Sequence, residues 1–454
     1  MTMTPRRLAG CAFCISFCLP ALAQQNLMLP APEQQVNGFS FGSPLVLSGG
    51  QDKGFIAGGK QLDDTTSVLT APALAFMSNS ARTHLSIQYQ PEFEMFSEHP
   101  NLNAWNHSAM FRFDHGITPR LTFEAGDLFL STNDPIRSLP NSLLMLQRGR
   151  FAQNSAYAGF SYRLDPGTTV GFHVNNVVLV TASPDPARPS FLDEMSTAWT
   201  ALVQRALTRR HAIAGSYSYL RFRPLGSQVD FQGSQLAPRP AMHNAALSYT
   251  YTPADAWVFQ VTAGAIRSQQ LAYTAGAQIE RRIGRVWAVA SYDRYLAFAG
   301  GFQPLGGVAP GTVQLANGVL PSSLYQVASL SFRGRLSRRV AIDVSGIRNL
   351  GQVSGQRVQT VIGRSRLEYR LTDRVIPFVS FEVYHQNLFP LLNFPLNRKR
   401  YSGGLQIILS RAAAIEAARA AAAPPAGLRR SEEQPVEPGA GRSGEAGQER
   451  QEEP

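Results

Sequence analysis

The sequence predicts an all-β protein, a transmembrane antiparallel up-and-down β-barrel of about 18 strands. Two observations support this fold class. From about residue 68 to residue 409, apolar and polar residues alternate in runs of roughly ten residues that are joined in pairs by tight polar turns. A tilted strand needs about 9 to 11 residues to cross the apolar layer of a membrane, whereas strands of soluble proteins usually have about 5 to 6. The runs fit the longer requirement.

The segment from Thr83 to Met95 shows the alternation most clearly. Its apolar positions are Leu85, Ile87, Tyr89, Pro91, Phe93 and Met95. The positions between them are polar or charged. Because successive side chains of a strand point to opposite faces, one face of this strand is suited to lipid and the other to a polar interior. The same unit recurs around the short turns 117–120 and 337–339.

Aromatic residues gather near the short turns. Tyr249 and Tyr251 precede the turn 252–255, and Trp257 and Phe259 follow it. Aromatic side chains of this kind concentrate where a membrane meets water. We therefore expect the short turns to lie at one membrane interface.

The number of strands follows from counting runs. Seventeen runs can be read up to the last one, over 399–409. Single-chain bacterial barrels have even strand numbers, so we expect one more strand between Phe39 and Lys60 and a total of 18, with 16 as the alternative. Two runs are irregular: 286–298 can be read with Trp287 and Val289 facing lipid or facing the lumen, and the run from 121 loses its phase at Asp127. A β-bulge would explain either case.

The N-terminal residues 1–23 have the pattern of a secretory signal peptide, with Arg6 and Arg7 before an apolar stretch and a small-x-small cleavage site ending at Ala23. Residues 24–38 would then be an N-terminal periplasmic segment. All three cysteines lie inside the predicted signal (Cys11, Cys14 and Cys18). The remaining chain could form neither a disulfide nor a thiolate metal site, and it has no cysteine nucleophile.

The predicted barrel spans residues 39–410 and is followed by an extension, 411–454. This extension begins with an alanine-rich stretch that favours a short helix, and it continues with almost no apolar residues. Such a composition cannot bury a core, which predicts a disordered periplasmic tail. The tail has six arginines and eight glutamates, so the formal net charge of +11 does not come from it.

The basic character of the barrel region indicates anionic partners. No groove-reading motif accompanies the charge, so we expect lipid phosphates and small polar or anionic solutes as partners, and no nucleic acid.

The last run resembles the insertion signal of bacterial outer-membrane β-barrel proteins of the porin-like kind, on the alternating residues Tyr401, Gly403, Leu405, Ile407 and Leu409. The resemblance covers about 39–409 and rests on architecture. It implies a place in the bacterial outer membrane, contact with outer-membrane lipids and with the barrel-insertion machinery, and in many relatives association into homo-oligomers. Short turns would face the periplasm and long ones the outside. Unlike the class, which commonly finishes on an aromatic residue, this chain continues beyond Leu409.

The alternation places two charged groups on the interior face. The basic group consists of Arg333, Arg335, Arg364, Arg366 and Arg370. The acidic group consists of Glu92, Glu94, Asp114 and Glu124. On different walls of a barrel, these groups would set up a transverse field that orients polar solutes and slightly favours anions. The alternative hypothesis is that they pair locally, as Glu368 and Glu382 could do with nearby arginines.

The function that these features predict is an outer-membrane channel for small polar solutes with a charged lumen. The alternative is a non-conducting barrel that scaffolds the envelope or exports a polymer. An outer-membrane hydrolase is less expected, because His84 and Ser86 share a face that points into the lumen, and Asp114-His115 lies beside a short turn. The eight histidines form no close ligand cluster, so we expect no metal, no cofactor and no enzyme.

Overall fold

The computed structural model describes residues 38–57, 60–134, 148–182, 194–225, 241–254, 256–268, 271–297, 323–353, 356–387 and 396–409. The predicted signal peptide, the periplasmic segment 24–38 apart from Gly38, and the C-terminal tail lie outside these residues. Within the described ranges, no helix has the length and apolar character needed to cross a membrane.

The described chain consists almost entirely of strands. The first third contains β1 (Gly38–Phe41), β2 (Leu45–Ala57), β3 (Lys60–Thr70), β4 (Leu74–Asn79), β5 (Thr83–Phe96), the short helix η3 (Pro100–Leu102), β6 (Ala104–Gly116) and β7 (Leu121–Thr132). The middle contains β8 (Arg150–Asp165), β9 (Thr168–Ala182), β10 (Glu194–Ala206), β11 (His211–Pro224), β12 (Met242–Ala254), β13 (Trp257–Arg267) and β14 (Leu271–Ile283). The last third contains β15 (Val286–Ala297), β16 (Ser323–Arg335), β17 (Val340–Val353), β18 (Gln356–Tyr369), β19 (Val375–Asn387) and β20 (Leu396–Ile407).

These segments form a closed antiparallel barrel of 18 strands, as predicted. Two of the strand positions in the barrel consist of two segments each. β3 and β4 share one position, because the long strand β5 pairs with both of them. β1 and β2 share the next position, because β1 pairs with β4 and β2 pairs with β3. The expected additional strand between residues 39 and 60 is therefore the broken strand β1 and β2. The alternative of 16 strands is wrong.

Each of the two breaks contains a proline, Pro44 in the first and Pro72 in the second. A proline cannot donate a ladder hydrogen bond, which explains why pairing is interrupted at these residues. The Ser43 hydroxyl joins the breaks, since it accepts hydrogen bonds from the Ala73 amide (2.9 Å) and from the Gln90 side chain (2.8 Å).

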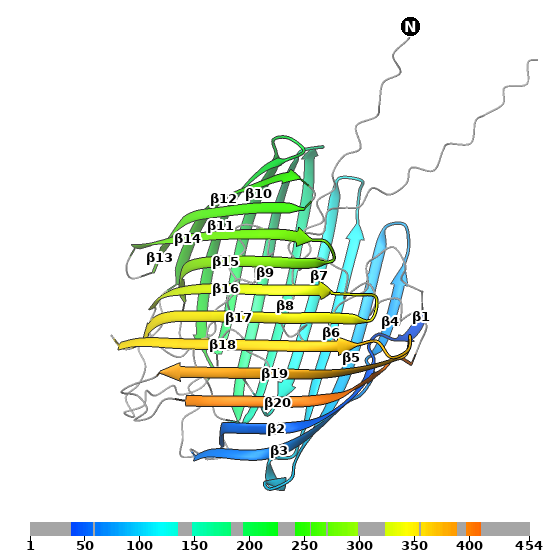
Figure 1. The fold of residues 1–454 in the computed structure, drawn as a ribbon. Coiled ribbons are helices and arrows are strands. Elements are labelled where there is room, and N and C mark those ends of the chain that lie inside the picture. Colours follow the sequence, from blue (N-terminus) through cyan, green and yellow to red (C-terminus); the bar gives the residue numbers. More distant parts are fainter. Residues whose placement is uncertain are drawn as a thin grey trace, which may run out of the picture.

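The barrel closes where β2 pairs with β20 (Figure 1). We call this pairing the seam. Glycines face one another across it, Gly49 opposite Gly403, and Gly50 lies opposite Ser402. A Cβ atom on Gly50 would overlap the Tyr401 carbonyl oxygen, whereas a Cβ atom on Gly49 would make only ordinary contacts, the nearest at 3.7 Å. The seam thus depends on the close approach that Gly50 permits.

The two faces of the sheet differ as the alternation predicts. On β5, Ile87 and Tyr89 are exposed on the outer face, while Ser86, Gln88 and Gln90 are buried on the inner face. An exposed apolar outer surface is what a lipid environment requires.

The structure also shows which face of the sheet the side chains of the two irregular runs occupy. Trp287 and Val289 are 7% and 8% exposed and lie on the face opposite Tyr292, which is 43% exposed, so they face the interior. Asp127 lies on the outer face with Ala125 and Phe129. The pairings of β7 and β15 with their neighbours run without a register shift, so a β-bulge is not the explanation of the irregular phase.

The two ends of the barrel differ in their connections. We call the end with the tight turns 80–82, 117–120, 166–167, 207–210, 284–285, 336–339 and 370–374 the hairpin end. The opposite end, the loop end, has the longer connections, together with three short ones between β2 and β3, β13 and β14, and β17 and β18. Its connections lie largely outside the described residues. The arrowheads of β14, β16 and β18 all point toward the hairpin end (Figure 1).

Replacing Gly50 with valine should hinder closure of the barrel. The added side chain collides with the backbone of β20, and overpacking of this kind costs about 1–3 kcal/mol. The expected result is a smaller folded fraction, measured as the share of protein with fast electrophoretic mobility before heating. Gly49→Val is the matched control and should fold like the wild type. Equal folded fractions for the two variants would contradict this account of the seam.

Candidate functional site: charged groups inside the barrel

Four charged residues from distant parts of the sequence meet beside the seam. Asp52 on β2, Glu94 on β5, and Arg398 and Arg400 on β20 are all buried. They lie on the face opposite exposed residues such as Met95 and Tyr401, which makes it the inner face. The barrel closure brings them together, because β2 stands between β20 and β3, and β3 pairs with β5.

Arg398 binds two carboxylates at once. Its Nε donates to Asp52 Oδ1 at 2.8 Å and its Nη2 donates to Asp52 Oδ2 at 2.5 Å. Nη1 and Nη2 also donate to the two Asp134 oxygens, at 3.0 and 2.6 Å. A planar guanidinium with several fixed donors is suited to such paired contacts with carboxylates.

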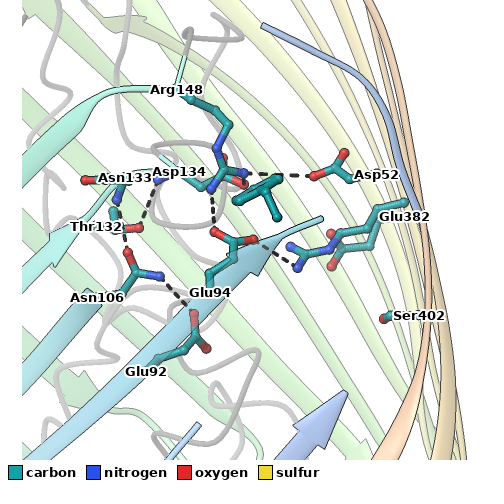
Figure 2. Close-up of polar contacts among 12 residues, drawn as sticks. Asp52, Glu92, Glu94, Asn106, Thr132, Asn133, Asp134, Arg148, Glu382 and Ser402 are labelled. Atoms are coloured by element: carbon teal, nitrogen blue, oxygen red, sulfur yellow. Dashed lines mark hydrogen bonds and ion pairs between the residues drawn. The ribbon is translucent and has the colours of Figure 1, made fainter. Parts of the chain in front are cut away.

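Arg148 and Arg400 share the carboxylate of Glu94. Arg148 Nη2 donates to Glu94 Oε2, and Arg400 Nη2 donates to Oε1 at 3.3 Å. Arg148 Nη1 also lies 3.3 Å from Asp134 Oδ2 and 4.0 Å from Asp52 Oδ2. Figure 2 shows Glu94 pointing from its strand toward Arg148, with Asp52 to the right of the arginine.

The Arg148 guanidinium also contacts two aromatic rings. Its Cζ lies 4.4 Å from the centre of the Phe96 ring and 5.6 Å from that of Phe55. These are cation–π distances. Phe55 and Phe96 pack against each other with Ala57 in a small hydrophobic cluster. The position of the Arg148 guanidinium is therefore fixed by both charged and apolar contacts.

We call the six charged residues the interior ion cluster: Asp52, Glu94, Asp134, Arg148, Arg398 and Arg400. Three carboxylates face three guanidinium groups, and the side chains are at most 8% exposed. Buried charges are tolerated only when they are paired and hydrogen-bonded. The cluster meets this condition with no net charge.

The cluster holds both ends of the connection between β7 and β8 inside the barrel. Asp134 follows β7, and Arg148 precedes β8. The Arg148 amide donates to the Ile56 carbonyl at 2.6 Å, and Arg148 forms a parallel bridge with Ala57. The two described ends of the connection, Asp134 and Arg148, therefore lie against β2 and β20 near the loop end.

A second set of polar contacts supports this arrangement. Glu92 accepts hydrogen bonds from the Thr70 hydroxyl (2.9 Å) and from the Asn106 amide (3.1 Å). Asn106 in turn accepts a hydrogen bond from the backbone of Asn133 at 3.0 Å, next to Asp134 (Figure 2). Of the predicted acidic group, Glu94 thus belongs to the cluster and Glu92 supports it.

The other two predicted acids lie toward the hairpin end. Arg112 Nε donates to Asp114 Oδ2 at 2.7 Å, and Asp114 pairs in register with Glu124, which is buried on β7. His84 and Ser86 lie nearby on the inner face, where His84 contacts the Asn79 side chain. On the outer face, His115 contacts the Thr83 hydroxyl, so the sheet separates it from Asp114.

The predicted basic group has acidic neighbours. Arg333 lies 3.8 Å from Asp343, Arg364 lies 4.0 Å from Glu382, and Arg366 lies 2.8 Å from Glu368. In addition, Arg364 donates to the Tyr384 hydroxyl at 2.8 Å, and Arg370 Nη1 lies 4.0 Å from Asp373. Arg335, at the end of β16, is half-buried. These contacts favour the hypothesis of local pairing.

Two further acids stand on the inner face beside this group. Glu280 on β14 is buried, and its carboxylate accepts a hydrogen bond from Gln278. Asp293 on β15 lies on the same face as Trp287 and Val289. The predicted basic residues on β16 and β18 therefore face carboxylates in comparable number. These acids are Glu280 on β14, Asp293 on β15, Asp343 on β17, Glu368 on β18 and Glu382 on β19.

Sequence reasoning missed five of the six cluster residues. Asp52 lies in the broken strand β1 and β2, for which the sequence predicts a strand between residues 39 and 60 without a direction for each side chain. Arg398 and Arg400 follow from the phase of the last run, because Tyr401 and Leu405 face outward. Asp134 and Arg148 lie outside the regular strands, where no periodicity indicates the direction of a side chain.

No protein-family model matches the chain, and no curated protein matches its sequence. Among solved structures, the siderophore receptor PirA from Pseudomonas aeruginosa is 9% identical, with a TM-score of 0.38, over 83% of this chain and 81% of that chain. The FrpB iron transporter from Neisseria meningitidis is 10% identical, with a TM-score of 0.41, over 80% and 82%. OccAB4 from Acinetobacter baumannii is 7% identical, with a TM-score of 0.42, over 83% and 99%.

At these TM-scores the likenesses support no inference about solute or mechanism. The class of protein is defined by the chain's own geometry: a closed antiparallel barrel of 18 strands with an apolar outer surface and a polar interior. This is the architecture of outer-membrane β-barrel proteins of the porin-like kind.

Replacing Arg398 with methionine should destabilise the barrel strongly. Asp52 and Asp134 would keep their burial but lose a guanidinium that contacts both, and breaking a buried pair in this way costs about 3–5 kcal/mol. The free energy of unfolding in detergent micelles measures the effect. The control is Asp373→Asn, which removes an exposed contact of Arg370 and should cost less than about 1 kcal/mol. Similar losses in both variants would contradict the structural importance of the cluster.

Proposed function

We propose that the protein is an outer-membrane channel through which small polar solutes cross by way of a charged lumen. The observation that carries this proposal is the row of charged side chains on the inner face of a closed barrel, which extends from the hairpin end (Arg112 and Asp114) to the loop end (Glu94 and Arg400). Paired charges and hydroxyl groups along a wall offer successive contacts that replace the hydration of a polar solute.

The interior ion cluster lies beside the path near the loop end. It fixes the two described ends of the β7–β8 connection, so solutes pass beside an assembly of paired charged side chains. Because the cluster has no net charge, it limits solutes mainly by size and by hydrogen bonding.

Charge selectivity through this interior is weak. The transverse field expected from the sequence requires a basic wall that faces an acidic one. The contacts of Arg364 and Arg366 with Glu382 and Glu368, and those of Glu94 with two arginines, reduce that separation of charge. Local pairing is the hypothesis that these distances support.

A non-conducting barrel is the second candidate, and one observation favours it. Many inner-face polar residues are buried, among them Gln88, Gln90 and Gln153. Tightly packed polar side chains fit an interior that is closed by the protein itself. Conductance in a planar bilayer separates the two candidates, because a plugged scaffold passes no current.

The wild-type protein should form stable pores in a planar bilayer. Replacing Arg148 with methionine removes its contact with Glu94 and loosens the β7–β8 connection, so single-channel conductance should rise by on the order of two-fold. The matched control is Arg333→Met, an interior arginine that contacts Asp343 on the adjacent strand β17. The absence of pores in all three proteins would contradict the channel and favour the scaffold.

Ion selectivity gives an independent test of the charge pairing. In a salt gradient, the reversal potential of the wild type should be small. Replacing Arg364 and Arg366 with glutamine leaves Glu382 and Glu368 without these partners, which should shift the reversal potential toward cation preference. A strong anion preference of the wild type would instead support the transverse field.

A further inference from the structure

The hairpin end carries a dense group of exposed arginines on one side of the barrel. Nine of them lie on four hairpins: Arg205, Arg209 and Arg210 between β10 and β11; Arg281, Arg282 and Arg285 between β14 and β15; Arg338 and Arg339 between β16 and β17; and Arg374 between β18 and β19. We call these nine residues the arginine arc. Among the described residues of these hairpins, Asp373 is the only exposed acid.

The arginines of the arc are not needed to neutralise the carboxylates inside the barrel. Many carboxylates of the inner face already have arginine neighbours there, as the pairs of Arg364, Arg366 and Arg398 illustrate. The excess positive charge of the barrel region therefore lies at its rims and on its outer surface. A concentration of guanidinium groups at one rim attracts anions.

Three arginines of the arc point toward lipid and not toward the aqueous mouth. Arg205 and Arg281 occupy outward-facing positions of β10 and β14. The Arg281 guanidinium lies 4.5 Å from the centre of the Trp257 ring, and Arg339 Nη1 donates to the Tyr369 hydroxyl at 3.5 Å. Outward aromatic residues mark the membrane interface, so these arginines lie at the level of lipid headgroups.

An exposed apolar residue accompanies the arginines on each of the four hairpins. Leu207, Ile283, Leu336 and Leu371 are 50%, 52%, 59% and 60% exposed on the outer face. Each lies within three residues of an arginine of the arc. An apolar side chain next to a guanidinium suits a boundary where one group enters the acyl region and the other remains among the headgroups.

We infer that the arginine arc binds the headgroups of anionic phospholipids in the leaflet at the hairpin end. A guanidinium group can contact two oxygens of one phosphate. The adjacent hairpins β14–β15, β16–β17 and β18–β19 offer several such groups side by side. This binding is independent of solute passage, so it stands or fails separately from the channel. Its consequence is an asymmetric lipid environment, with anionic lipids held along β10–β19.

The test uses the full-length protein in detergent micelles, titrated with phosphatidylglycerol or with phosphatidylcholine and followed by native mass spectrometry. We expect phosphatidylglycerol adducts at a lipid concentration about ten-fold lower than phosphatidylcholine adducts. The triple variant Arg205→Gln, Arg281→Gln and Arg339→Gln should lose this preference. Equal binding of the two lipids by the wild type overturns the proposal.

The matched control changes three exposed, outward-facing arginines at the loop end: Arg221→Gln, Arg267→Gln and Arg348→Gln. This variant has the same change in net charge and should keep most of the preference. An equal loss in both triple variants overturns the proposal, since attraction would then be spread over the whole barrel. Heat-dependent electrophoretic mobility verifies that each variant is folded.

The acidic part of the chain beyond the barrel is the alternative ligand of the arginine arc. Residues 431–454 contain seven glutamates and two arginines. A full-length variant with these glutamates replaced by glutamine separates the two occupants. If the wild type shows no lipid preference and this variant does, the arc binds the chain's own acidic segment and the lipid proposal fails. If both show the same preference, the lipid proposal is supported.

Discussion

The structure depends on one constraint, that every backbone N–H and C=O group of a strand in lipid must find a partner within the protein. An open sheet would leave two unpaired edges, so the first and last strands must pair. Here that pairing is the seam between β2 and β20, where Gly50 lets the two backbones approach closely. Strand length, alternation and the position of the charged cluster all follow from this closure.

The same constraint explains how much of the fold the sequence predicts. A strand that separates lipid from a polar interior must alternate along its whole length, so β5 (Thr83–Phe96) and β6 (Ala104–Gly116) begin and end where the alternation does. The breaks between β1 and β2 and between β3 and β4 were not predicted, because local pattern alone does not reveal that a prolonged partner such as β5 bridges them.

The candidate site could be predicted only in part. Alternation identifies the face to which Glu94 or Arg364 points, since that depends on the strand alone. It does not identify the partner, because Arg400 reaches Glu94 only after the barrel closes and Arg148 only through a connection that enters the interior. Charge balance inside the barrel is therefore a property of the closed structure. For the same reason, sequence order does not reveal that Arg364 and Arg366 lie next to Glu382 and Glu368.

The origin of the cluster residues along the chain has a consequence for assembly. Its three carboxylates belong to the first part of the sequence, whereas two of its three guanidinium groups are on the final strand, at Arg398 and Arg400. A barrel that lacked this strand would have an excess of negative charge in its interior as well as an open edge. Docking of the last strand removes both defects in a single step, so intermediates without it are disfavoured electrostatically as well as by unpaired backbone groups.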